Sequence, residues 1–136
     1  MCAGTLRALA YLHANDVIRR DVKAANVMVT QDFTARVGDL GASRDVDLDD
    51  TMTRIGSPVY MAPEMLKRRG DARSDVYSLG ILLYECLYGD VPFRGESEWE
   101  VLRKHETAAP EFPESALPAD CEVIRRCLAK QPEDRF

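Results

Sequence analysis

The sequence predicts an α+β fold that is mainly α-helical and carries one small β-hairpin. Residues 2–14 place apolar side chains at helical spacing along one face, which is the pattern of an amphipathic helix. Residues 75–88 are apolar nearly all round, which is typical of a helix buried on every side. Two short β-type runs, 27–29 and 33–37, flank a turn-like Thr-Gln-Asp, and this arrangement favours a hairpin.

Size and composition indicate one domain with a hydrophobic core. The chain has 136 residues, of which 46% are apolar and 30% are charged, as in ordinary globular domains. The formal net charge of −5 argues against binding to nucleic acid or to an anionic membrane. No apolar run reaches the length of a membrane span, and the start shows no signal-peptide pattern. We therefore expect a cytoplasmic protein.

The four cysteines are Cys2, Cys86, Cys121 and Cys127, and no two of them form a Cys-x-x-Cys pair. With only two histidines in the chain, this spacing argues against a zinc site and favours reduced thiols, as in the cytosol. We expect Cys121 and Cys127 to be small packing residues.

The first helical pattern carries Leu6, Leu9, Ala10 and His13 on one face, and Asn-Asp at 15–16 ends it. We expect His13 to be a packed residue near the helix end rather than a ligand. The pattern is at full strength almost from the first residue. We therefore expect the chain to start inside a larger domain.

The stretch 18–29 contains the main candidate catalytic residues of the chain. It places a carboxylate, an ammonium and a carboxamide within six positions, at Asp21, Lys23 and Asn26. A loop held between short strands would aim these groups at one point. Phosphoryl transfer needs such a set: a group that takes or orients the hydroxyl proton, a cation for the phosphate, and a neutral oxygen ligand for magnesium. The alternative interpretation is a solvated polar loop.

Asp39 lies in Gly-Asp-Leu-Gly at 38–41. Glycines on both sides permit unusual backbone angles and close approach of a ligand, although a plain turn is the alternative. Residues 42–60 then show no periodicity and include an acidic run. A loop of this length inside a compact domain is usually functional or mobile.

Two further helices and a proline-rich loop are predicted after residue 90. Ser-Glu-Trp-Glu at 97–100 is a capping box that opens a short helix to about His105. We expect Trp99 to be a core anchor, with a contact to substrates or partners as the alternative. Residues 108–118 form the loop, and apolar residues within 123–128 mark one face of the last helix.

Four short blocks occur in the order, and with roughly the spacing, that protein kinases show. They are Arg-Asp-Val-Lys-Ala-Ala-Asn at 20–26, Asp-Leu-Gly at 39–41, Ala-Pro-Glu at 62–64 and Ser-Asp-Val-Tyr-Ser-Leu-Gly at 74–80. The chain therefore resembles the C-terminal lobe of the eukaryotic protein kinase family, of serine/threonine type. The resemblance implies one partial kinase domain over residues 1–136, from the helix before the catalytic loop to just before the last helix. The N-terminal lobe would be absent, since the sequence holds no glycine-rich loop, strand lysine or partner glutamate.

The resemblance implies roles for individual residues. Asp21 resembles the aspartate that accepts or orients the substrate's hydroxyl proton, and Lys23 would neutralise charge on the moving phosphate. Asn26 and Asp39 would hold Mg²⁺, and Met28 would form part of the floor under the adenine of ATP. The implied function is transfer of the γ-phosphate of ATP to serine or threonine of protein substrates.

Other positions match structural and regulatory residues of the family. Glu64 would pair with Arg135, and Asp75 would hold the backbone of the catalytic loop. Arg20 and Arg44 would grip a phosphate on the activation segment.

Thr53 is the expected activating phosphosite because it lies three residues before Gly56, where the family's primary site usually falls. Thr51 is the second candidate, and ordinary loop residues are the alternative. Ser57 matches the hydroxyl that contacts the catalytic aspartate and lysine in serine/threonine kinases. The acidic run at 45–50 could partly satisfy the two arginines without a phosphate.

Two substitutions depart from the family pattern. Arg19 stands in place of the usual histidine, so we expect its guanidinium to reach a carboxylate or solvent. Leu40 stands in place of the usual phenylalanine, which is an apolar replacement. Because the motifs of the N-terminal lobe are missing, we expect this chain alone to be inactive. The alternative function is a non-catalytic truncated kinase or pseudokinase that acts as a protein-binding module.

Overall fold

The computed structural model describes residues 2–19, 21–31, 35–38, 57–67 and 69–136. These residues are mainly helical, as predicted. The helices and strands are α1 (Cys2–His13), β1 (Val27–Val29), β2 (Ala35–Val37), α2 (Ala72–Tyr88), α3 (Glu98–Thr107) and α4 (Pro118–Cys127). Short 3₁₀ helices cover Ala24–Asn26, Pro58–Tyr60, Pro63–Lys67 and Pro132–Asp134. Among the described residues, no helix has the length and apolar character needed to cross a membrane.

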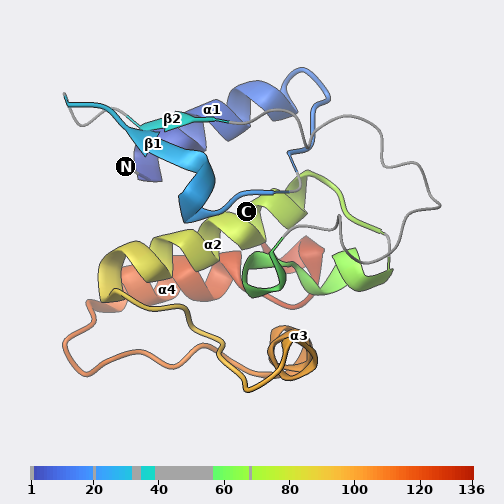
Figure 1. Ribbon diagram of the computed structural model, residues 1–136, viewed down its shortest axis with the longest axis vertical. Helices are drawn as coiled ribbons and strands as arrows, with labels where there is room; N and C mark the ends of the chain where they lie inside the picture. Colours follow the sequence, from blue (N-terminus) through green and yellow to red (C-terminus); the bar gives the residue numbers. More distant parts are fainter. Residues whose placement is uncertain (1, 20, 32–34, 39–56, 68) are drawn as a thin grey trace.

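Helix α2 runs through the middle of the molecule, with α1 and the strands on one side and α4 and α3 on the other (Figure 1). Two reciprocal hydrogen bonds cap the N-terminus of α2. The carboxylate of Asp71 accepts the N–H of Arg73 at 2.8 Å, and the Oγ of Ser74 accepts the N–H of Asp71 at 3.2 Å. The helix ends at Gly89, where φ is 77°, a left-handed conformation that favours glycine.

Two apolar clusters pack against different faces of α2. One joins α2 to α4 and contains Ala62, Tyr77, Ile81, Phe93, Ile124 and Leu128. The other joins α2 to α1 and contains Leu9, Val22, Leu79 and Leu82. The prediction of burial on every side is wrong for the last turn, where Leu87 is 46% exposed, because neither cluster covers that side.

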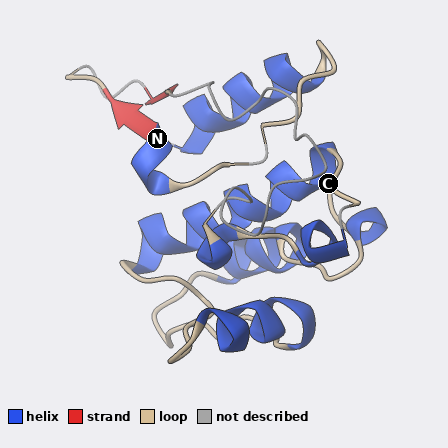
Figure 2. Cartoon of the chain, turned by 45° about the vertical axis from the view of Figure 1, so that its right-hand side comes forward, coloured by secondary structure: helices blue, strands red, loops and turns tan. Residues whose placement is uncertain are grey.

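The two strands pair antiparallel, with Val27 opposite Val37 and Val29 opposite Ala35. Figure 2 shows this pair beside the N-terminal helix. The second strand was predicted over 33–37, of which residues 33 and 34 lie outside the described part of the chain. The hairpin places β2 against α1, and β1 pairs with β2.

Helix α3 begins after Ser97, whose Oγ accepts the N–H of Glu100 at 3.2 Å. The Glu100 carboxylate accepts the N–H of Glu96 at 2.9 Å. The prediction that Trp99 is a core anchor is wrong, since this residue is 74% exposed. The buried face of α3 is set by Val101 and His105, and a residue two positions from Val101 falls on the opposite face of a helix.

Candidate active site

The residues at 17–26 lead from α1 to β1 and carry the predicted catalytic group. Val22 is buried in the apolar cluster between α1 and α2. Because successive side chains of an extended chain point to opposite sides, burial of Val22 turns Asp21 and Lys23 away from the core. Their side chains are 16% and 28% exposed.

Asp21 is the centre of the group. Its Oδ2 lies 2.9 Å from Nζ of Lys23 and accepts a hydrogen bond of 2.7 Å from Nδ2 of Asn26. The same amide nitrogen donates to the backbone carbonyl of Asp21 at 3.0 Å. The structure thus brings together the three polar groups at one point. Nδ2 makes both hydrogen bonds of the Asn26 side chain, and within the described residues Oδ1 makes none.

A buried carboxylate on α2 anchors this loop. Asp75 is 1% exposed, and its Oδ2 accepts the backbone N–H of Arg19 at 2.9 Å. Nε2 of His13 lies 2.8 Å from the same oxygen. The end of α1, the loop and α2 are therefore joined at one atom, and His13 packs there as a half-buried residue.

Arg19 does not reach solvent, since it is 1% exposed. Its Nη2 donates a hydrogen bond to the backbone carbonyl of Gly38. The N–H of Gly38 in turn donates to the carbonyl of Asn26 at 2.8 Å. The guanidinium therefore joins the loop after α1 to the residue that directly precedes Asp39.

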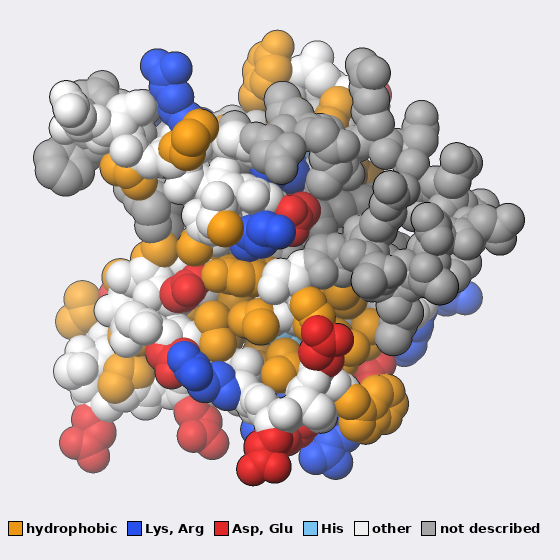
Figure 3. Space-filling view, viewed as in Figure 1, with side chains coloured by type: hydrophobic (Ala, Val, Ile, Leu, Met, Phe, Trp, Pro, Cys, Tyr) orange, Lys and Arg blue, Asp and Glu red, His pale blue; other side chains and the backbone are white. Residues whose placement is uncertain are grey.

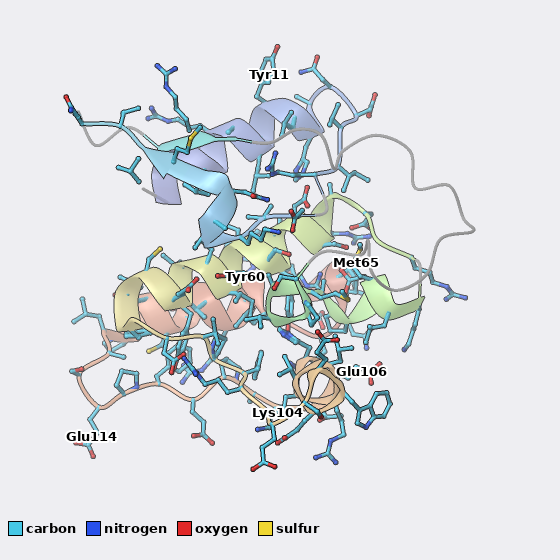
Figure 4. The ribbon with its side chains drawn as sticks, viewed as in Figure 1. Tyr11, Tyr60, Met65, Lys104, Glu106 and Glu114 are labelled. Carbon is cyan, nitrogen blue, oxygen red and sulfur yellow. The ribbon has the colours of Figure 1, made fainter. Side chains whose placement is uncertain are left out.

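Ser57 shares a small cavity with Asp21 and Val22, although these residues are distant in sequence. The cavity has a volume of about 10 Å³, which is room for about one water molecule. Tyr60 and Met65, which are labelled in Figure 4, also line it. Ser57 and Asp21 therefore line one cavity.

Sequence reasoning missed the contacts of Tyr60. Its hydroxyl donates to the carboxylate of Glu85, and its carbonyl accepts a hydrogen bond of 2.7 Å from Oγ of Ser78. Burial, together with Glu85, raises the pKa of Tyr60 to about 12, so the hydroxyl stays protonated at neutral pH. No local spacing pattern could have paired Tyr60 with a residue 25 positions away.

Glu64 and Arg135 form a bidentate ion pair. Nη1 of Arg135 lies 2.6 Å from Oε1 of Glu64, and Nη2 lies 2.9 Å from Oε2. Oγ of Ser74 also donates to Oε1 at 2.7 Å. Burial raises the pKa of the Glu64 carboxyl, but the hydrogen bonds from Arg135 and Ser74 outweigh it and hold the pKa below its usual value. This pair joins the 3₁₀ helix Pro63–Lys67 to the C-terminal segment.

The remaining predicted site residues divide into two groups. Met28 is on β1 and is 60% exposed. The other group lies outside the described residues and consists of Arg20, Asp39, Arg44, Thr51 and Thr53.

An Asp-Lys-Asn group thus lies on a loop held by the central helix of a mainly helical fold. The chain belongs to the protein kinase domain family, whose model matches residues 1–136.

The chain is similar to named serine/threonine kinases. It is 41% identical to serine/threonine-protein kinase PknB of Mycobacterium tuberculosis, over 98% of this chain and 23% of that protein. It is 42% identical to serine/threonine-protein kinase PkaA of Streptomyces coelicolor, over 94% of this chain and 25% of that protein. A probable LIM domain-containing serine/threonine-protein kinase of Dictyostelium discoideum is 39% identical, over 94% of this chain and 20% of that protein. The chain thus spans about a quarter or less of the length of these relatives.

Proposed function

We propose that the chain is the catalytic-loop part of a serine/threonine protein kinase domain, which transfers the γ-phosphate of ATP to serine or threonine of protein substrates. The observation that carries this proposal is the contact of Asp21 with both Lys23 and Asn26. The names of the three relatives support the serine/threonine class. Residues 1–136 would form the C-terminal lobe of that domain.

Asp21 would act on the attacking hydroxyl. As the substrate oxygen forms its bond to the γ-phosphorus, the bond to the ADP oxygen breaks and the hydroxyl proton passes to the carboxylate of Asp21. The hydrogen bond from Nδ2 of Asn26 orients that carboxylate. The partly exposed ammonium of Lys23 is within reach of a phosphate beside Asp21 and would neutralise its charge.

Asn26 and Asp39 would hold Mg²⁺. Two observations support the fit: the amide oxygen of Asn26 makes no hydrogen bond within the described residues, and the residue before Asp39 is hydrogen-bonded to Asn26. Carboxylate and amide oxygens are the ligands that Mg²⁺ prefers. When bound, Mg²⁺ would neutralise charge on the phosphate oxygens. Met28, exposed on β1, would contact the adenine.

A cytoplasmic location is part of the same proposal. Cys121 and Cys127 are free thiols, which suits a reducing compartment. The net charge of −5 suits protein partners better than nucleic acid or an anionic membrane.

The experiment joins this chain to the nucleotide-binding lobe of a relative and measures transfer of labelled phosphate to peptides. Serine and threonine peptides should be phosphorylated, and a matched tyrosine peptide should not. Asp21→Asn should lower the rate about 10²- to 10⁴-fold, the usual contribution of a general base. Asp16→Asn, an exposed change that precedes the loop, is the control and should leave the rate unchanged. Full activity of Asp21→Asn would exclude the proposed role.

A binding module without catalysis is the second candidate function. The observation in its favour is Trp99, which is 74% exposed on α3 and can serve as an anchor for a partner. The joined protein separates the two functions. If it folds and binds Mg-ATP but transfers no phosphate to any peptide, the non-catalytic function is the better one.

A further inference from the structure

A second cavity lies at the C-terminal end of α2, where the loop between α3 and α4 passes (Figure 1). It has a volume of about 340 Å³ and is lined by Tyr84, Tyr88, Asp90, Glu111, Phe112 and Pro113. It shares no lining residue with the cavity beside Asp21. Its volume is at the lower end of the range for small-ligand sites, which suits a single long side chain.

Three aromatic rings lie in this lining at steep angles to one another. The centroids of Tyr84 and Tyr88 are 4.8 Å apart with planes at 68°, and those of Tyr88 and Phe112 are 6.1 Å apart at 78°. Faces of aromatic rings attract cations. The guanidinium of Arg125 already lies 4.8 Å from the centroid of Phe112. The ring of Phe112 thus already stacks with a guanidinium group in the structure.

Two carboxylates border the rings. Oδ1 of Asp90 accepts the N–H of Val91 at 2.6 Å and pairs with Arg94. In the described part of the chain, Oδ2 of Asp90 has no hydrogen-bond partner. The backbone carbonyl of Glu111 accepts the hydroxyl of Tyr84 at 2.8 Å, while its exposed carboxylate makes no ion pair with a described residue.

The surroundings of the cavity are acidic as well. Glu114, on the same loop, points away from the ribbon into solvent (Figure 4). Figure 3 shows further Asp and Glu side chains along this lower edge of the molecule, with Lys or Arg side chains among them. Among the described residues, Arg94 pairs with Oδ1 of Asp90 and Arg125 lies over the ring of Phe112, which leaves Oδ2 of Asp90 and the carboxylate of Glu111 as acceptors. An aromatic floor with acceptor oxygens at its edge is therefore open to a ligand.

We propose that this cavity binds the guanidinium of an arginine in a basic peptide segment of a protein partner. A guanidinium is planar, stacks on aromatic faces and offers five donors in a fork, so it can satisfy Asp90 and Glu111 at once. A neutral or anionic group would add no ion pair to Oδ2 of Asp90 or to the carboxylate of Glu111. The site goes beyond the catalytic function because it lies apart from Asp21.

The test is a titration of the isotope-labelled chain with acetyl-arginine-amide, followed by the amide signals in NMR spectra. Acetyl-citrulline-amide is the matched probe, since it has nearly the same shape without the charge. Amide signals of residues 84–90, 111 and 112 should shift with the arginine compound and saturate in the millimolar range. The citrulline compound should leave them unchanged. Equal shifts with both compounds, or no shift in these residues, would overturn the proposal.

Variants test the two halves of the site. Glu111→Gln should weaken binding about two- to fivefold, the range for an exposed ion pair, and Glu114→Gln is the control with the same change of charge on the same loop. Phe112→Leu should weaken binding by removing the ring face, and circular dichroism checks that it is folded. If Glu114→Gln weakens binding as much as Glu111→Gln does, the attraction is general and the proposed site is wrong.

Discussion

The backbone N–H of Arg19 donates a hydrogen bond of 2.9 Å to Oδ2 of Asp75, although the two residues are 56 positions apart. Nε2 of His13 lies 2.8 Å from the same oxygen. Because Asp75 is almost completely buried, both contacts are shielded from water. The position of the catalytic loop therefore depends on a side chain of α2.

The first prediction concerns this buried carboxylate. Asp75→Ala leaves the N–H of Arg19 and the ring of His13 without their acceptor, and each unsatisfied buried group costs about 1–3 kcal/mol. We expect the free energy of unfolding, measured by chemical denaturation, to fall by at least that amount. Glu122→Ala, at an exposed position of α4, should change it by no more than about 0.5 kcal/mol. Equal effects of the two variants would show that Asp75 does not anchor the loop.

The second prediction concerns the Glu64–Arg135 pair. Arg135 has a fully buried side chain, and removing the charge of its partner should cost about 3–5 kcal/mol of unfolding free energy at pH 7. The folded pKa of Glu64 lies below the ordinary value of 4.5, so the pair stabilises above that value and loses its contribution as the pH falls through the folded pKa.

Glu64→Gln should therefore be less stable than the natural chain at pH 7, and the difference should shrink as the pH falls below 4.5. Denaturation curves over this range measure it. Glu133→Gln, which changes an exposed carboxylate near Arg135, is the control and should show little difference at either pH. If the difference in free energy of unfolding between the natural chain and Glu64→Gln stays constant down to low pH, the stabilisation is not ionic in origin.

The third prediction concerns nucleotide binding by the 136-residue chain itself. It contains no glycine-rich loop and no strand lysine, which supply much of the phosphate contact in kinases. We expect calorimetry to find only weak Mg-ATP binding and a radiolabel assay to find no turnover. Micromolar affinity would contradict this, as would turnover that disappears on Asp21→Asn.

The fourth prediction concerns phosphorylation and rests on sequence alone. We propose that a phosphate on Thr53 would be held by Arg20 and Arg44, since it carries about −1.5 to −2 charges and bonds strongly to guanidinium groups. In the joined kinase, Thr53→Ala should lose activity and Thr51→Ala should keep it. Full activity of Thr53→Ala, with no phosphate found on that residue by mass spectrometry, would make the assignment wrong.

Helix positions could be predicted from the sequence where a local pattern of apolar spacing or capping residues decides the structure. The apolar run in α2 and the Ser97 cap predicted the helices, since spacing and caps are properties of neighbouring residues. Cys121 and Cys127 are buried, as expected of packing residues, but Val123, which the spacing placed on the same face as Cys127, is 42% exposed. The failure at Trp99 has a physical cause: burial of Val101 and His105 decides which side of α3 faces inward, and composition does not reveal that.

The site could be predicted less completely from sequence. The convergence of Asp21, Lys23 and Asn26 followed from their short spacing. The contact between His13 and Asp75 and that between Tyr60 and Glu85 join segments far apart in the chain. Only the packing of α1 and the 3₁₀ helix Pro58–Tyr60 against α2 brings them together.

The most direct test of the catalytic account is a double-mutant cycle in the joined kinase. Asp21→Asn, Asn26→Ala and the double variant are compared by kcat/KM for one serine peptide. If Asn26 orients the carboxylate of Asp21, the two act as a unit, and the double variant should be little worse than Asp21→Asn alone. If the fold-loss in kcat/KM of the double variant equals the product of the losses of the two single variants, Asp21 and Asn26 do not act as a unit. A double variant with unchanged kcat/KM would contradict the catalytic role of the whole loop.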